Sequence, residues 1–197
     1  MKSFLSFLAL GVAATAAVSV FPATAVAAVD SSDPGRFIDT LADTAFAALR
    51  TGNPAAARGQ FRAILSQHFD VGAIGDRLIQ RQRASLTPAQ YNQYRAAFPG
   101  FIVGTYGDRL APYANADLRV IRVIPRGNSA AVVTTVTRPG GRPANAVWTV
   151  TRTGTGYKVN NLTVGGVNLG LAQQADFDSF IQRRGFDALI AFMKSRG

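Results

Sequence analysis

The spacing of apolar residues changes in the second half of this 197-residue sequence, and that change constrains the fold more than any other feature. In the first half, apolar side chains recur every three or four positions, as in amphipathic helices. From Leu118 onward the period becomes two, which is typical of strands with one buried face. The predicted strands are residues 118–124, 130–138, 144–152 and 157–164. Short links containing Gly, Pro or Asn join them, so we expect an antiparallel meander.

The link between the last two strand segments is the clearest turn. Gly154-Thr155-Gly156 lies between runs of β-branched and aromatic residues, which predicts a hairpin. Gly165-Gly166 then permits a sharp bend, because glycine readily adopts positive φ. Helical spacing resumes over residues 173–195, where Gly185 interrupts it. The sheet is therefore expected to end in a hairpin and a bend that lead into a final, divided helix.

Helices are also predicted ahead of the strands. Asp33-Pro34 and Asn53-Pro54 each fit an N-cap followed by proline at the first helical position. Thr87-Pro88-Ala89-Gln90 fits a capping box. Pro99 lies inside the helix that follows, so we expect a kink or a break there, at a cost of about 3 kcal/mol. The expected fold class is α+β, with several helices packed on a four-stranded antiparallel meander sheet.

Residues 1–27 have the layout of a secretory signal peptide. Lys2 precedes a long apolar run, and Ala25-Val26-Ala27 supplies a cleavage pattern. The alternative is an uncleaved membrane anchor, but the small residues at the end of the run favour cleavage. We therefore expect a single domain over residues 28–197, located outside the cytoplasm.

The charge balance is strongly basic. Lys and Arg number 21, the acidic residues, all Asp, number 11, and the formal net charge is +10. This favours anionic partners such as lipid headgroups, membrane surfaces or nucleic acid, although scattered Arg residues also fit a merely soluble surface. The absence of cysteine excludes disulfides, thiolate metal sites and a cysteine nucleophile.

Five short motifs follow one another along the chain. They are Phe69-Asp70-Val71-x-x-Ile74, Leu86-Thr87-Pro88-Ala89-Gln90-Tyr91, Phe98-x-x-Phe101-x-x-x-x-Tyr106, Tyr157-Lys158-Val159-x-Asn161-Leu162-x-Val164-x-Gly166-Val167-Asn168-Leu169 and Gly185-Phe186-Asp187-Ala188-Leu189-Ile190. In this order and spacing they resemble the MlaC, or toluene-tolerance, family of periplasmic phospholipid-binding proteins. The resemblance covers nearly all of residues 28–197. Tyr157, Asn161, Gly165 and Asn168 stand where the family usually has Trp, Asp, Glu and Ser.

The resemblance implies that helices and sheet enclose an apolar cavity, similar to a nuclear-transport-factor-like cone. It implies a periplasmic carrier that moves phospholipid between an outer-membrane lipoprotein complex and an inner-membrane ABC transporter of the Mla type. We expect a monomer, since a shuttle gains nothing obvious from assembly. Such a carrier maintains the lipid asymmetry of the outer membrane. The resemblance implies no cofactor, no metal and no catalytic residue. A hopanoid-associated branch of the family makes a hopanoid or another hydrophobic lipid the alternative cargo.

The acyl chains are expected between the inner face of the sheet and the aromatic-rich helices, because two lipid tails must be shielded from water. The candidate lipid-binding residues are Phe37, Leu41, Phe61, Phe98, Phe101, Ile102 and Tyr106 on the helices and Val132, Val136, Trp148, Val150, Leu162, Val164 and Val167 on the sheet side. For each residue taken alone, the alternative is ordinary core packing. Arg138, Arg142 and Arg152 lie near strand ends, where Arg can attract a lipid phosphate, but a solvated surface is the simpler interpretation.

Two other classes of function fit less well. An enzyme on a similar cone would need a positioned base, and the single histidine, His68, lies on a helical stripe with no Ser or Asp tied to it by spacing. A nucleic-acid-binding module is compatible with the charge, but export and the scattered Arg residues argue against it.

Overall fold

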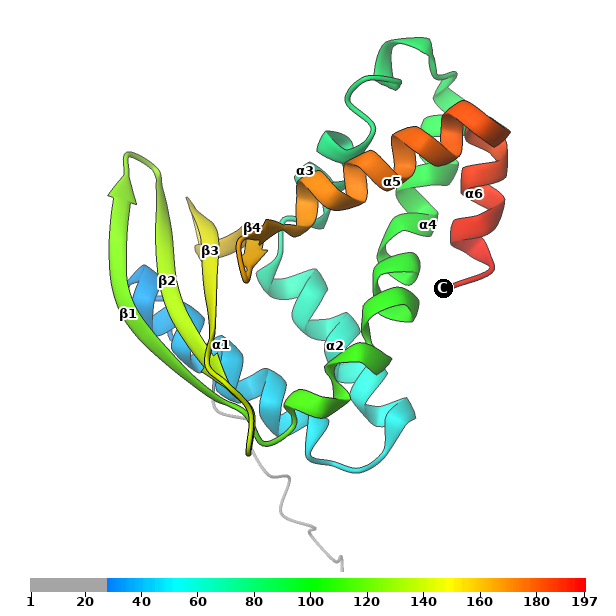
Figure 1. The fold of residues 1–197 in the computed structure, drawn as a ribbon. Coiled ribbons are helices and arrows are strands. Elements are labelled where there is room, and N and C mark those ends of the chain that lie inside the picture. Colours follow the sequence, from blue (N-terminus) through cyan, green and yellow to red (C-terminus); the bar gives the residue numbers. More distant parts are fainter. Residues whose placement is uncertain (1–27) are drawn as a thin grey trace, which may run out of the picture.

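A computed structural model describes residues 28–197 (Figure 1). The predicted leader, residues 1–27, lies outside the described residues and stays a prediction. The helices are α1 (Pro34–Leu49), α2 (Pro54–His68), α3 (Val71–Leu78), α4 (Pro88–Tyr106), α5 (Leu169–Arg184) and α6 (Phe186–Lys194), with short 3-10 helices η1 (Arg83–Ser85) and η2 (Asp108–Tyr113). The strands are β1 (Asp117–Arg126), β2 (Ser129–Thr137), β3 (Ala144–Thr153), β4 (Gly156–Val164) and β5 (Val167–Asn168).

All of these strands belong to one antiparallel sheet with the order β1-β2-β3-β4-β5. The four predicted segments are confirmed as β1 to β4, with ends that differ by at most two residues. The expectation of a four-stranded sheet is wrong, because β5 is a fifth strand. Gly165 and Gly166 have φ angles of 56° and 84°, so the chain reverses within two residues and pairs Val167 with Val164.

The predicted helix starts are confirmed in their capping geometry. Asp33 Oδ1 accepts hydrogen bonds of 2.8 and 3.0 Å from the backbone N–H groups of Gly35 and Arg36. Thr87 and Gln90 form the reciprocal capping box, with bonds of 3.2 and 3.1 Å. These side chains satisfy donors that the first helical turn leaves unpaired, so each helix start is fixed by local chemistry.

Two expectations about helix interruptions had different outcomes. The break at Pro99 is not found, because α4 continues through it, with the neighbouring Phe98 and Phe101 buried in the helical core. That burial offsets the lost hydrogen bond. The division of the last helix is confirmed: Gly185 has a φ of 82° and separates α5 from α6. However, α5 begins at Leu169, capped by Asn168, rather than at the expected position 173.

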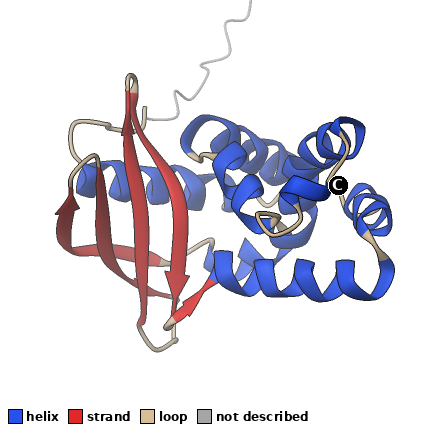
Figure 2. Cartoon of the chain, turned by 90° about the horizontal axis from the view of Figure 1, so that it is seen from above, coloured by secondary structure: helices blue, strands red, loops and turns tan. Residues whose placement is uncertain are grey.

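Residues 28–197 form two hydrophobic clusters rather than one. In Figure 2, α1 lies behind the sheet and the other helices gather beside it. The buried residues of the sheet cluster join α1 and α2 to the sheet: Phe37, Ile38, Leu41, Ile64, Ala130, Val132, Val150, Tyr157 and Val159. Those of the helical cluster join α3, α4, α5 and α6: Leu78, Ile79, Tyr94, Phe98, Phe101, Phe177, Phe186, Leu189, Ile190 and Met193. Each fully buried apolar side chain contributes about 1.5–3 kcal/mol, so each cluster stabilises its own layer.

The junction between α2 and α3 connects the two layers. Phe69 forms a single parallel bridge with Val159, and the backbone N–H of Asp70 donates a 2.9 Å hydrogen bond to the carbonyl of Val159. Arg77 on α3 donates a 3.2 Å bond to the carbonyl of Asn160. Asn160 is the extra residue of a β-bulge in β4, and its carbonyl therefore points to a helix rather than into the ladder.

The C-terminal residues lie against α4, as Figure 1 shows near the C label. A Cβ atom built on Gly104 would lie 1.5 Å from the carbonyl oxygen of Arg196, and one on Gly100 would lie 3.2 Å from Cα of Gly197. At Gly104 only glycine permits this approach without a shift of the backbone. Among residues 28–197, no helix combines the length and the apolar character that crossing a membrane requires.

Candidate functional site

The face of the sheet that carries α1, here called the inner face, is lined by an aligned set of apolar side chains. Val132, Trp148 and Leu162 occupy directly paired positions on β2, β3 and β4, so they share that face. Val136 lies four residues after Val132, and Val164 lies two residues after Leu162, which places both on the same face. The alternation in the sequence therefore predicted the orientation of these side chains correctly.

One half of the inner face is covered by α1. Phe37 and Leu41 of α1 pack with Val132 and Val150, and all four residues are at most 3% exposed. These candidate lipid-binding residues are enclosed by protein, so they serve as core in this structure. Burial of Phe37 against Tyr157, with ring centroids 5.9 Å apart, fixes α1 on the sheet.

The other half of the inner face is only partly buried, and we call it the open half. Its residues are Leu118, Val136, Trp148, Leu162 and Val164. Leu118 pairs directly with Val136 and was not recognised from the sequence, because its register against β2 is set by the tertiary fold. Val167 pairs with Val164 at the sheet edge and is 55% exposed. The open half thus offers partly exposed apolar side chains on neighbouring strands, around the buried Thr134 and Ala146.

The indole of Trp148 is held by a buried hydroxyl. Its Nε1–H donates a 3.0 Å hydrogen bond to Thr134 Oγ1, and Thr134 is fully buried. The hydroxyl of Thr134 in turn donates a 3.4 Å bond to the carbonyl of Ala146. Because its only hydrogen-bond donor is satisfied inside the sheet, the Trp148 ring offers an apolar surface and needs no polar group from a ligand. No pattern in the sequence pointed to Thr134, since its contact with Trp148 depends on strand register.

The candidate lipid-binding residues on the helices do not lie together in the structure. Phe98 and Phe101 are buried in the helical cluster, and Ile102 packs against it half-buried. Phe61 is half-buried on α2. Tyr106, also half-buried, donates a 2.8 Å hydrogen bond to Gln173 Oε1 and so connects the end of α4 to the start of α5. Gln173 carried no recognisable signal in the sequence.

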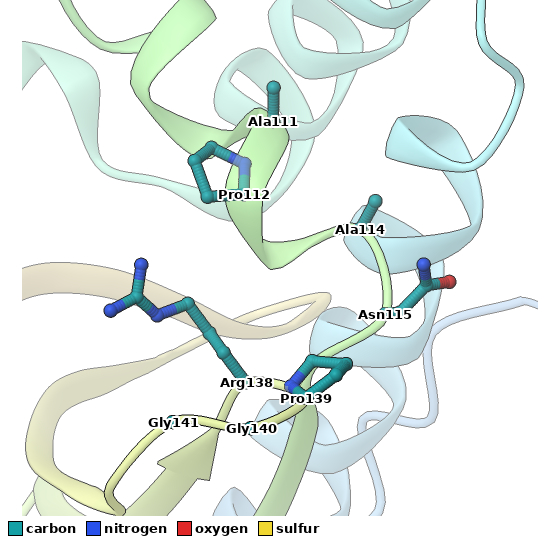
Figure 3. A pocket seen from close by; sticks show the side chains of 8 residues that line it. All are labelled: Ala111, Pro112, Ala114, Asn115, Arg138, Pro139, Gly140 and Gly141. Atoms are coloured by element: carbon teal, nitrogen blue, oxygen red, sulfur yellow. The ribbon is translucent and has the colours of Figure 1, made fainter.

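A surface hollow of about 450 Å³ lies at the end of the sheet where the open half is found. It is formed by η2 and the link between β2 and β3: Ala111, Pro112, Ala114, Asn115, Arg138, Pro139, Gly140 and Gly141 (Figure 3). The Arg138 guanidinium lies 5.3 Å from the ring centroid of Tyr113. Arg142 is exposed, whereas Arg152 stacks on Tyr157 at 4.8 Å and donates to its hydroxyl. Arg152 is therefore already engaged within the protein.

The single histidine is held in an apolar setting. His68 packs on Phe37, with ring centroids 6.0 Å apart. Burial, and secondarily the charge of Lys158, lowers the pKa of His68. The imidazole therefore stays neutral near neutral pH, as a packing residue does. Within residues 28–197, no three His, Cys, Asp or Glu side chains gather in the way that a metal site requires.

Comparison with known proteins places this geometry in a family. The structure is similar to that of the phospholipid-binding protein from Ralstonia solanacearum in complex with a phospholipid, with a TM-score of 0.69 and 23% sequence identity over 84% of this chain and 97% of that chain. At that identity the likeness shows a common fold. Residues 36–195 match the family described as MlaC protein. Since the match spans most of the sequence, the chain belongs to the MlaC family.

Proposed function

We propose that this protein is a periplasmic carrier of phospholipid. The observation that carries the proposal is the open half of the inner face, where Val136, Trp148, Leu162 and Val164 leave apolar surface partly uncovered. Its one polar donor, the indole N–H, is satisfied by Thr134. Such a surface favours hydrocarbon over any polar ligand. Membership of the MlaC family and the phospholipid bound to the similar Ralstonia protein support the same cargo.

The transfer of two acyl chains from water to the protein requires an enclosed site rather than a surface groove. Two acyl chains contain about thirty methylenes at ~0.8 kcal/mol each, so roughly 25 kcal/mol of gross transfer free energy is at stake. To recover it, the chains must be enclosed between the open half and the helices that carry Phe61, Ile102 and Tyr106. We propose that the sheet with α1 moves away from α4, α5 and α6 to enclose them, each layer keeping its own hydrophobic cluster. We propose that the acyl chains occupy the space gained between them.

Lipid carriage by this route requires no covalent chemistry. His68, the only histidine of the chain, packs on the ring of Phe37, a fully buried core residue. We therefore infer a binding protein rather than an enzyme.

The test is the lipid content of the purified mature protein and of two matched variants. Val164 and Thr163 are neighbours on β4 with side chains on opposite faces of the sheet. In native mass spectrometry, Val164→Asp should reduce the lipid-bound fraction by about tenfold or more, since a carboxylate against hydrocarbon costs several kcal/mol. Thr163→Asp should retain the wild-type content. A wild-type protein with no bound lipid and no uptake from vesicles would refute the carrier function.

We further propose that the protein shuttles its lipid between an outer-membrane lipoprotein complex and an inner-membrane ABC transporter of the Mla type, and so maintains outer-membrane lipid asymmetry. The check is transfer of labelled phospholipid between two vesicle populations, each bearing one purified complex. Lipid-loaded protein that donates to neither population would be a store rather than a shuttle. The mass of the co-purified lipid separates phospholipid from the alternative cargo, a hopanoid.

A further inference from the structure

A second hollow, of about 600 Å³, lies between α5 and α6, and we call it the α5–α6 groove. Its lining residues are Phe180, Arg183, Arg184, Ala188, Ala191, Phe192 and Ser195. The rings of Phe180 and Phe192 stack with centroids 5.2 Å apart, and both remain partly exposed. Ala188 and Ala191 lie one turn apart on α6, so their small side chains keep the groove open. The groove therefore has an apolar, aromatic floor.

The rim of the groove is positively charged. Arg184 and Arg196 lie over the rings of Phe180 and Phe192, at 5.8 and 5.3 Å from their centroids. Arg183 donates a hydrogen bond to the hydroxyl of Ser179. Within the described residues, no carboxylate forms an ion pair with any of these three arginines. Their charge is thus available to a partner.

Two acidic groups on α5 and α6 are already engaged. Asp178 on α5 accepts a 3.0 Å bond from Arg81 and a 2.7 Å bond from Gln82. Asp187 on α6 accepts a 2.9 Å bond from Gln90. These two carboxylates hold α5 and α6 to the preceding helices, and neither pairs with an arginine of the rim. An aromatic floor with a cationic rim is complementary to apolar side chains flanked by carboxylates.

The geometry points to the α5–α6 groove as the docking site for an acidic, apolar segment of a protein partner in lipid exchange; this inference rests on the proposed carrier function. A concave groove between two helices suits a peptide segment better than a flat bilayer surface. Figure 1 shows α6 at the end of the molecule opposite β1. Docking there leaves the open half of the sheet free to release or receive lipid.

The experiment measures binding of the lipid-loaded protein to each purified Mla-type membrane complex, with two variants of the groove. Arg183→Glu/Arg184→Glu reverses the rim charge, and Ala191→Trp fills the groove without changing charge. Both should weaken binding to the same complex by about tenfold or more. The control, Arg122→Glu/Arg126→Glu, makes the same charge change at two exposed positions on β1 and should bind as the wild type does.

The remaining arms separate the possible outcomes. Unchanged binding of both groove variants, or no binding of the wild type to either complex, would overturn the docking site. The docking site would also be overturned if the groove variants lost binding to vesicles of phosphatidylcholine and phosphatidylglycerol but still bound the membrane complexes as the wild type does. The groove would then be a bilayer contact. Native mass spectrometry of the same samples reports lipid content independently. Full lipid content with unaltered docking would refute this inference and leave the carrier function standing, whereas empty wild-type protein would refute the carrier function itself.

Discussion

The hydroxyl of Tyr106 on α4 donates a 2.8 Å hydrogen bond to the side-chain carbonyl of Gln173 on α5. Burial raises the pKa of Tyr106, so the phenol stays protonated and remains a donor throughout the neutral range. Tyr106→Phe should lower the free energy of unfolding by about 0.5–1.5 kcal/mol, the usual contribution of a neutral hydrogen bond. Guanidinium chloride titrations will measure it. In a double-mutant cycle with Gln173→Ala, additive losses would mean that the two side chains do not interact in solution.

A second tyrosine donates a hydrogen bond to an unpaired carbonyl at the end of a helix. The hydroxyl of Tyr94, which is fully buried, donates a 2.7 Å bond to the carbonyl of Gly75 in the last turn of α3, where carbonyls lack helical partners. Tyr94→Phe should therefore cost about 1–3 kcal/mol, because it leaves a buried acceptor unpaired. The control is Tyr113→Phe, at a half-buried ring that keeps its contact with Arg138. Equal losses in the two variants would contradict this account of α3.

The stability of the fold should depend on pH through His68. Burial, with a smaller effect of Lys158, lowers the pKa of His68 in the folded protein. The unfolded chain therefore binds the proton more tightly than the folded chain does. Stability is fully present above the unfolded value of about 6.5 and falls as the pH drops through it towards the lower folded pKa.

Urea titrations at about pH 7.5 and about pH 5.5 will measure this decline. The hydrogen bond from Arg36 lowers the pKa of Asp30 to about 2, so that carboxyl does not titrate over this interval. His68→Gln should flatten the profile. A decline of the same size in that variant would assign the effect to another group.

The contact between the C-terminal residues and α4 predicts opposite effects for two glycine substitutions. Gly104→Ala would place a methyl group 1.5 Å from the carbonyl oxygen of Arg196 and should cost about 1–3 kcal/mol, the usual range for overpacking. Gly59→Ala, in the interior of α2 with open space around it, should stabilise the protein by about 0.5–1 kcal/mol. Thermal unfolding of both variants tests the pair, and a Gly104→Ala protein as stable as the wild type would refute the tight contact.

The sequence was sufficient for features that depend on near neighbours. Asp33 and Thr87 cap the helices that they were predicted to cap, since the bonds close within three residues. The strands followed from alternation alone. β5 was missed because two residues are too short for a periodic pattern, and its pairing depends on the turn at Gly165-Gly166.

Features that depend on distant neighbours could not be predicted. Phe37 and Phe98 lie on similar apolar stripes, yet one packs on the sheet and the other among helices. The sequence does not distinguish them, because an apolar stripe predicts that a helix face is buried but does not identify the element that it packs against. The bond from Trp148 to Thr134 likewise requires the register of β2 against β3. Most residues of the open half were predicted to lie on one face of the strands. Which of these residues α1 covers could be seen only in the structure.

Trp148 is the only tryptophan in the chain, and it lies on the open half. Its fluorescence is therefore free of background from other indoles, and emission from the unmodified protein reports on the polarity of that one surface. Loading and unloading can be followed in real time without a labelled lipid. A blue shift on mixing with vesicles would time the arrival of hydrocarbon beside the ring.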